Sequence, residues 1–332
     1  MTGSFIGEVL WIQTNETEDA SILFLLDNKE VNMQIKRKER TYQIIIAILT
    51  ILLLLETVCL LQRRKEDAPV DRNESENEIV VDAYISEHFE EALQDGSIQV
   101  WYQPIIDPKT DEIVSGEALS RWKDKEEYIS PSVFVSELEA SGQIVELDKN
   151  VFLNACSFQK KQMEKGEELF PIAVNLSALS LMKEDIVEEY AAYYKESGLD
   201  QGLVNIEVTE SLDTDKKILM DVVKGFQEAG FHVEIDDFGA GYASYENLSV
   251  VPYDVIKFDK SLIDQIENEK GKRILSDLIA MAKDFGMTTI AEGVETQVQM
   301  ELLKEMEIDG IQGYYYSRPL PQDELESFIE SR

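Results

Sequence analysis

Short apolar, β-branched runs alternate with amphipathic stretches from about residue 96 to the C-terminus. The amphipathic stretches include Lys149–Lys165, Ile186–Ser197, Lys216–Ala229 and Lys270–Phe285. The strand-like runs are Gln99–Gln103, Ile113–Leu119, Ile172–Leu176, Val204–Val208, Val233–Asp236, Val255–Phe258, Thr288–Ala291 and Ile311–Tyr315. Alternation of this kind is typical of βα units around a parallel sheet. Eight such strands predict an α/β fold of the (β/α)8 barrel type.

A polar side chain stands at or just after the end of each predicted strand. The set comprises Gln103, Glu117, Asn175, Glu207, Glu210, Asp236, Asp237, Lys257, Asp259, Glu292, Glu295 and Gln312. In such a barrel the carboxyl ends of the strands surround the active site, so these groups are expected to converge. Acids so close together repel one another unless cations gather them, and oxygen ligands suit Mg²⁺ or Mn²⁺. Two adjacent aspartates with several glutamates suit two metal ions, the arrangement used in phosphoester hydrolysis.

Each member of this set also has a structural explanation. Asp236 and Asp237, in "FHVEIDDFGAGYASY", are residues that turns and helix caps favour. Glu210 and Glu295 are acids of the kind preferred in a first helical turn, and Asn175 could cap the loop after it. The local sequence leaves these alternatives open.

Two basic residues are harder to explain by packing alone. Lys257 stands inside an apolar run, where a lysine is costly without an anionic partner. Arg121 precedes Trp122 and could pack against it, but a planar guanidinium near the rim is equally suited to a phosphate.

The composition restricts the chemistry further. The chain has 31 Lys and Arg against 66 Asp and Glu, a net charge of −35, which argues against a DNA or RNA polymer as partner. Its histidines are His88 and His232, and neither is placed for a nucleophilic triad or a zinc site. Its cysteines, Cys59 and Cys156, lie in apolar or helical stretches, so we expect both to pack as ordinary apolar side chains. Hydrolysis would therefore depend on carboxylates and oxygen-bound metals.

The region before the barrel has a different pattern. Residues 42–61 are an apolar run long enough for a transmembrane helix, with basic residues on both sides, although Glu56 would also fit a buried Leu-rich helix. We expect residues 1–41 to be a short extracytoplasmic segment and residues 62–84 a linker. Residues 85–332 would form the main domain. The flanking charges nearly balance, so they do not set the orientation.

Beyond these patterns, the motifs resemble those of a known family. "GEALSRW" matches the signature of EAL-domain proteins, and "YQPI", "VNLS", "EVTE", "DDFGAG", "IKFD", "AEGVET" and "QGYYYSRP" follow in the family's order across about residues 85 to 332. The resemblance implies a modified TIM barrel with one antiparallel strand, usually in a homodimer. It also implies hydrolysis of cyclic di-GMP to linear pGpG with two Mg²⁺ or Mn²⁺ ions.

The resemblance also implies a role for each motif residue. The expected metal ligands are Glu117, Asn175, Glu207, Asp236 and Asp237, with Asp236 shared by both ions. Glu292 would be the catalytic glutamate, acting with Lys257 and Glu117. The expected substrate-binding residues are Gln103, Leu119, Arg121, Arg318 and Gln312. Glu210, Asp259 and Glu295 would be supporting residues of the site, and Asp259 would support Lys257.

The departures from the family pattern are small. Many members have Thr in place of Ala240 and Ser in place of Ala243, so the loop after the aspartates is expected to be looser while every ligand remains. Since cyclic di-GMP is an intracellular messenger, we expect a single-pass protein of the inner membrane with a cytoplasmic catalytic domain. A receptor that binds cyclic di-GMP without cleaving it is the main alternative, and an unrelated metal-dependent barrel hydrolase is a third.

Overall fold

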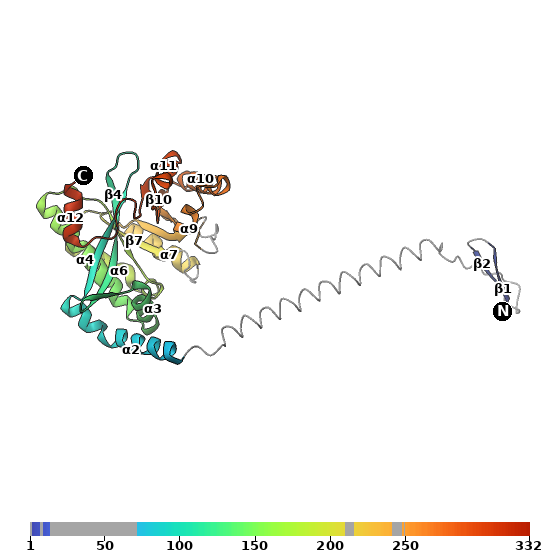
Figure 1. The fold of residues 1–332 in the computed structure, drawn as a ribbon, viewed down its shortest axis with the longest axis horizontal. Coiled ribbons are helices and arrows are strands. Elements are labelled where there is room, and N and C mark those ends of the chain that lie inside the picture. The colour runs from blue at the N-terminus through green and yellow to red at the C-terminus, as the bar shows by residue number, and fades with distance from the viewer. Residues whose placement is uncertain (1, 7–8, 14–71, 210–215, 241–247, 249) are drawn as a thin grey trace. The chain divides into compact units, whose positions relative to one another are not determined.

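The computed structural model describes residues 2–6, 9–13, 72–209, 216–240, 248 and 250–332 (Figure 1). The chain divides into two compact units, Met1–Asn77 and Glu78–Arg332. In the first unit, strand β1 (Thr2–Ile6) pairs antiparallel with strand β2 (Val9–Gln13). The second unit contains the motifs described above.

Eight strands of the second unit close into a barrel. They are β3 (Ile98–Ile106), β4 (Ile113–Asp124), β6 (Ile172–Asn175), β7 (Val204–Thr209), β8 (Val233–Phe238), β9 (Val255–Phe258), β10 (Thr288–Ala291) and β11 (Gly310–Ile311). Their order is β3-β11-β10-β9-β8-β7-β6-β4, and pairing between β3 and β4 closes the ring. Strand β3 is antiparallel to both neighbours, whereas the other neighbouring pairs are parallel. The modified TIM barrel with one antiparallel strand is therefore confirmed.

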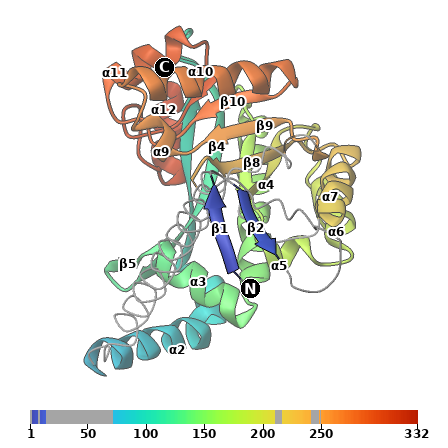
Figure 2. The same cartoon turned by 90° about the vertical axis from the view of Figure 1, so that its right-hand side faces the viewer.

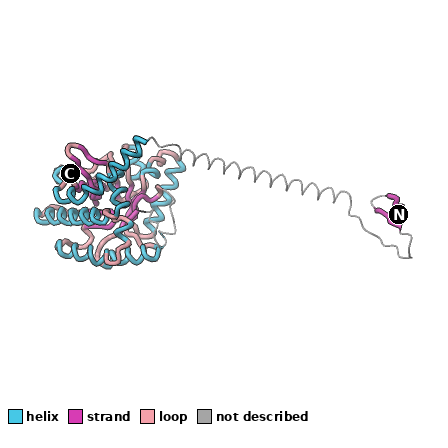
Figure 3. Tube along the Cα trace, turned by 90° about the horizontal axis from the view of Figure 1, so that it is seen from below, coloured by secondary structure: helices cyan, strands magenta, loops and turns pink. Residues whose placement is uncertain are grey.

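Helices surround these strands, as Figures 2 and 3 show for this unit. They are α2 (Arg72–Asp95), α3 (Pro131–Ser141), α4 (Ile144–Lys165), α5 (Ala178–Leu181), α6 (Ile186–Ser197), α7 (Lys216–Glu228), α9 (Lys260–Ile263), α10 (Glu269–Asp284), α11 (Gln297–Glu305) and α12 (Gln322–Glu330). Helix α10 illustrates the sequence pattern, because its buried Leu275, Ile279 and Ala282 recur every three or four residues. The side chain of Asn268 caps its first turn by accepting from Gly271 N.

Strands β3 and β4 are longer than predicted and extend past the barrel. A short strand, β5 (Glu127–Ile129), pairs antiparallel with the far end of β4. Trp122 of β4 packs there between Phe89 of α2 and Phe134 of α3, with ring centroids 6.0 and 5.9 Å away. These aromatic contacts bury the extension in the same apolar core as the barrel, which favours continuation of the two strands.

Two other boundaries differ from the sequence prediction. Strand β11 ends at Ile311, and the chain turns at Gly313. The backbone there passes so close to Val294 that a Cβ added to Gly313 would lie only 2.1 Å from Val294 O. Helix α2 begins at Arg72, inside the predicted linker of residues 62–84. Its first turns contain several glutamates, which are good helix formers, and its buried Ile85, Phe89 and Ala92 then form an apolar face.

The predicted membrane location is corrected. Within the ranges that the structure describes, no helix is long and apolar enough to cross a bilayer. The longest of them, α2, is rich in acidic residues. The predicted span at residues 42–61 lies outside the described residues. An apolar run is a local signal only, and the single-pass inner-membrane location based on it is withdrawn.

Candidate active site

Lys257 lies at the centre of the acidic cluster predicted from the strand ends. Its side chain is fully buried. Its Nζ lies 2.6 Å from Glu207 Oε1 and 2.6 Å from Glu292 Oε1. It also lies 3.4 Å from Glu117 Oε2 and 3.3 Å from Asp236 Oδ1. The lysine of the apolar run thus has four carboxylate partners, which compensate the cost of burying its charge.

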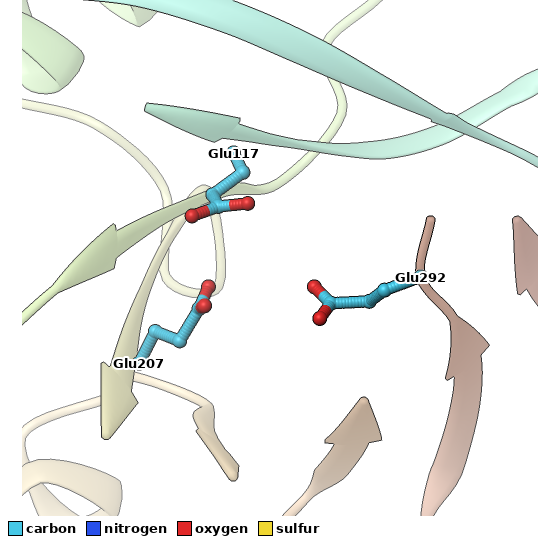
Figure 4. Close-up of side chains that lie close together, drawn as sticks. All are labelled: Glu117, Glu207 and Glu292. Atoms are coloured by element: carbon cyan, nitrogen blue, oxygen red, sulfur yellow. The ribbon is translucent and has the colours of Figure 1, made fainter. Parts of the chain in front are cut away.

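Three of these acids come from strands far apart in sequence. Figure 4 shows the carboxylates of Glu117 on β4, Glu207 on β7 and Glu292 after β10 directed toward a common space. Parallel strands bring their carboxyl ends to the same end of the barrel, which explains the convergence.

Three amide side chains hold Glu117 in place, and those of Gln103 and Gln312 are buried. Asn175 Nδ2 donates to Glu117 Oε1 at 2.8 Å, and Gln312 Nε2 donates to Glu117 Oε2 at 2.6 Å. Gln312 Nε2 also lies 3.1 Å from Gln103 Oε1, while Gln103 Nε2 donates to Ser317 O at 3.0 Å. The three amides, Gln103 within β3, Asn175 at the end of β6 and Gln312 just after β11, therefore form one network around a single carboxylate.

The electrostatics reflect four acids around one cation. Burial opposes the charge of Lys257, but the surrounding carboxylates raise its pKa well above the ordinary value. Burial and then the charge of Glu117 raise the pKa of Glu207 well above its usual range. Burial likewise raises the pKa of Glu292 to about 8, against the pull of Lys257. The cluster carries more negative charge than Lys257 alone balances.

Asp236 and Asp237 lie within β8, at an irregularity in its pairing with β9 just before the strand ends at Phe238. Asp237 has a left-handed φ of 56°, and Gly239 has a φ of 99°. The side chain of Leu262 fills the space that a Cβ at position 239 would need, so glycine is required there. Burial, followed by the neighbouring charge of Asp236, raises the pKa of Asp237 to about 6. Ala240 N donates to Asp237 O at 3.0 Å, whereas Ala243 lies outside the described residues.

The donor set fits divalent cations. Oxygen atoms of Glu117, Glu207 and Glu292 lie within 4.8 Å of one another, as do those of Asp236, Asp237 and Glu292. Glu207 Oε2 is buried and has no hydrogen-bond partner. Hard oxygen donors with excess negative charge and an unsatisfied acceptor suit Mg²⁺ or Mn²⁺.

A cavity of about 350 Å³ lies over the cluster. The predicted residues that line it are Gln103, Glu117, Leu119, Asp236, Asp259, Glu292, Glu295 and Gln312. A second cavity of about 380 Å³ shares Leu119 with the first and is lined by Arg121 and Asn175. Both volumes are in the range of small-molecule sites.

The remaining predicted residues have distinct positions. Arg121 donates to Ser120 O, and its guanidinium lies 5.7 Å from the centre of the Trp101 ring. The guanidinium of Arg318 stacks 4.0 Å from the ring of Tyr314 and is not among the residues that line the first cavity.

The two described supporting residues, Asp259 and Glu295, contact other groups at the rim. Asp259 caps α9 by accepting from Ser261 N at 2.9 Å, and its described contacts do not include Lys257. Glu295 pairs with Lys260 at 3.2 Å. Glu210 lies outside the described residues.

The sequence prediction missed Lys260, Gly293 and Tyr314, which also line the first cavity. Each is next to a residue in the predicted set or two positions from one, so proximity to the strand-end motifs was the available signal. It also missed Glu234, which is 1% exposed and lies two residues before Asp236 on β8. The two-residue period of a strand places both on the same face.

An acid-rich, amide-braced site at the carboxyl end of a modified TIM barrel defines a class of metal-dependent barrel proteins. The family model described as "EAL domain" matches residues 86–319. The chain belongs to the EAL domain family.

Named relatives agree with this membership. The chain is 34% identical over 252 residues to "Cyclic di-GMP phosphodiesterase NbdA" of Pseudomonas aeruginosa, an alignment that covers 74% of this chain and 32% of the relative. It is 31% identical over 245 residues to "Oxygen sensor protein DosP" of Escherichia coli, covering 73% and 30%. The chain thus spans about a third of the length of these curated relatives.

Solved structures give the same result. "PaMucR Phosphodiesterase, c-di-GMP complex" is 28% identical with a TM-score of 0.69, covering 73% of this chain and 99% of that one. An EAL domain protein from Listeria monocytogenes is 29% identical with a TM-score of 0.66, covering 74% and 98%.

Proposed function

We propose that this chain hydrolyses cyclic di-GMP to linear pGpG with two Mg²⁺ or Mn²⁺ ions, through a catalytic domain at residues 85–332. The observation that carries the proposal is the cluster of Glu117, Glu207, Asp236 and Glu292 around Lys257, because it combines excess carboxylates with a fixed cation. The names of the related NbdA and of the PaMucR complex support the choice of substrate.

The proposed metal ligands are Glu117, Asn175, Glu207, Asp236 and Asp237. Divalent cations at these residues would supply Lewis-acid activation of water and charge neutralisation at the phosphodiester. Gln312 and Gln103 keep the carboxylate of Glu117 oriented through their amide network. Because that network is buried, little reorganisation is needed when a ligand binds.

The proposed reaction is attack of water on one phosphorus. The water oxygen bonds to phosphorus, one ester P–O bond breaks, and the departing sugar oxygen takes up a proton from solvent. Glu292 accepts the proton of the attacking water through its carboxylate, and Lys257 donates a hydrogen bond to the phosphate or the water. Burial of Lys257 keeps its ammonium fixed for this role.

The nucleotide would extend from the first cavity into the second past Leu119. Arg121 lines the second cavity and would contact a phosphate or a base edge. Arg318 and Tyr314 would contact the opposite side of the nucleotide. The ring of Tyr314 holds the stacked guanidinium of Arg318 in position.

A turnover assay tests this function. The full chain, incubated with cyclic di-GMP and Mn²⁺, is expected to form pGpG, and Glu117→Ala is expected to form none. Exposed Glu228→Gln is the matched control and should keep full turnover. Tight nucleotide binding by calorimetry without turnover would instead identify a receptor, and failure to bind the nucleotide would reject the substrate.

We also propose that the active form is a homodimer. Light scattering of the purified chain would give twice the monomer mass. A monomer with full turnover would contradict this assembly.

A further inference from the structure

The barrel interior has a second layer of inward-facing residues below the acidic cluster. Since side chains alternate along a strand, this layer lies two residues from the cluster on each strand. It comprises Ile105, Ser115, Ala173, Asn205, Glu234, Val255, Ile290 and Gly310. Barrel interiors are usually filled by bulky branched residues, whereas small and polar residues predominate here.

A cavity of about 340 Å³ adjoins this layer at the end of the barrel opposite the proposed active site. Its lining comes from the beginnings of strands such as β4, β7, β8 and β10 and from the end of β3, which runs in the other direction. Among the residues that the structure describes, none lines both this cavity and the one over the acidic cluster.

Two unpaired acceptor atoms belong to Asn205 and Glu234, buried residues that are among those lining this cavity. Asn205 Nδ2 donates to Glu234 Oε1 at 2.8 Å. The other two polar atoms of the pair, Asn205 Oδ1 and Glu234 Oε2, are buried and have no hydrogen-bond partner. Glu234 is 1% exposed and Asn205 is 3% exposed. An unsatisfied buried acceptor is costly, so these two atoms call for a donor.

The surroundings specify the kind of donor. One free carboxylate matches a single positive charge, and the neighbouring Val255, Ile290 and Ile308 provide apolar contact. A divalent ion would need several more hard oxygen ligands, and an anion would be repelled by Glu234. Asp107, Asp309, Lys109 and His232 also line the cavity, and Asp309 pairs with Lys283 at 3.0 Å, so the buried, unpaired oxygen of Glu234 is what selects a cation here.

We propose that this cavity is a binding site for a small primary alkylammonium ion, with Glu234 Oε2 and Asn205 Oδ1 accepting its N–H groups. The aliphatic part of the ligand lies against Val255 and Ile290. The site is separate from the proposed catalytic cluster and does not depend on the proposed phosphodiesterase activity.

Calorimetry on the full chain tests the site with ethylammonium chloride as the probe. Saturable binding is expected for ethylammonium. Tetramethylammonium chloride at the same ionic strength carries the same charge without an N–H donor and is expected to give no binding. Equal binding of both ions, or of K⁺ and ethylammonium, would overturn the assignment.

Glu234→Gln is the diagnostic variant. A glutamine can exchange two hydrogen bonds with Asn205, so the fold is retained while the charge is removed. Ethylammonium affinity is expected to fall at least about tenfold, as loss of a charged hydrogen-bond partner predicts. Exposed Glu228→Gln is the matched control and should bind like the wild type.

A crystal structure of the full chain with ethylammonium provides a second measurement that does not require a variant. Density for the ion between Glu234 and Asn205 is the expected result. A water molecule in that place, or a closed pair in which a protonated Glu234 donates to Asn205 Oδ1, would overturn the proposal.

Discussion

Lys257 shows how one residue controls the balance of charge in the barrel. Its ammonium contacts four carboxylates, and its side chain is completely shielded from solvent. Removing one partner of a buried ion pair leaves the other charges without compensation. The effect is larger here than for a surface pair, because solvent cannot replace the missing cation.

We predict that Lys257→Met lowers the free energy of unfolding by about 3–5 kcal/mol in a chelating buffer. Urea unfolding followed by circular dichroism measures the loss. Lys260→Met is the matched control: that lysine is 43% exposed and its pairs lie at the surface, so its loss should be below about 1 kcal/mol. Similar losses in the two variants would contradict the assignment of Lys257 as the central counter-ion.

Asp148 is a second buried charge, in the first turns of α4. Its Oδ2 accepts from Ser177 N at 2.9 Å and from Ser180 Oγ at 2.7 Å. Burial raises the pKa of Asp148 to about 6, although these hydrogen bonds lower it. The folded state therefore binds this proton more tightly than the unfolded chain, where an Asp pKa is about 3.9.

This shift predicts a pH dependence with a definite sign. The stabilisation by the bound proton is complete below about pH 4 and is lost as pH rises through about 6. The free energy of unfolding falls by up to about 3 kcal/mol over this range. Asp148→Asn can still accept both hydrogen bonds but does not titrate. Its stability relative to wild type should therefore improve between pH 4 and pH 7 in urea unfolding. A constant difference across this range would refute the prediction.

Helix α11 shows how an element supports the rim. Thr296 Oγ1 accepts from Gln299 N at 3.2 Å, and Gln299 Oε1 accepts from Thr296 N at 3.1 Å and Glu295 N at 2.9 Å. This capping box begins the helix four residues after Glu292. It therefore holds the segment that carries two of the predicted site residues.

We predict that Thr296→Ala destabilises the fold by about 1 kcal/mol, because the first turn loses its side-chain acceptor. Thr296→Ser keeps the hydroxyl and should lose much less. Thermal unfolding of the three proteins measures both effects. Equal melting temperatures for wild type and Thr296→Ala would show that the cap contributes nothing.

The closed barrel is the largest structural unit of the molecule. Strand pairing around the whole ring leaves it without a free sheet edge. Its buried residues form a core that runs from Ile85 in α2 to Leu325 in α12. The unit Glu78–Arg332 thus contains a complete core of its own.

We predict that residues 78–332 fold cooperatively by themselves, with the same melting temperature as the full chain. Circular dichroism of both proteins checks this. Adding Mn²⁺ should raise the melting temperature of each by mass action, and should raise that of Glu117→Ala much less. Loss of a cooperative transition in the shorter chain would show that the barrel needs the preceding residues.

Local patterns predicted most elements well. The bounds of β9 and β10 agree with the prediction, because short β-branched runs between polar loops are recognisable locally. The predicted β11 was too long, since the "GYYY" run looks strand-like until the close approach of Gly313 to Val294 forces a turn. Metal ligation and the role of each site residue stay predictions.

The sequence by itself determined the barrel class and the polar residues at the strand ends, because both depend on short-range periodicity. Pattern alone did not indicate an antiparallel strand; the family resemblance implied one, and the structure shows that it is β3. Only the tertiary structure decided that Lys257 contacts four acids at once. It also decided that Glu234 accepts a hydrogen bond from Asn205 in the layer below. Those contacts join strands up to 140 residues apart, so they depend on how the closed barrel aligns its strands.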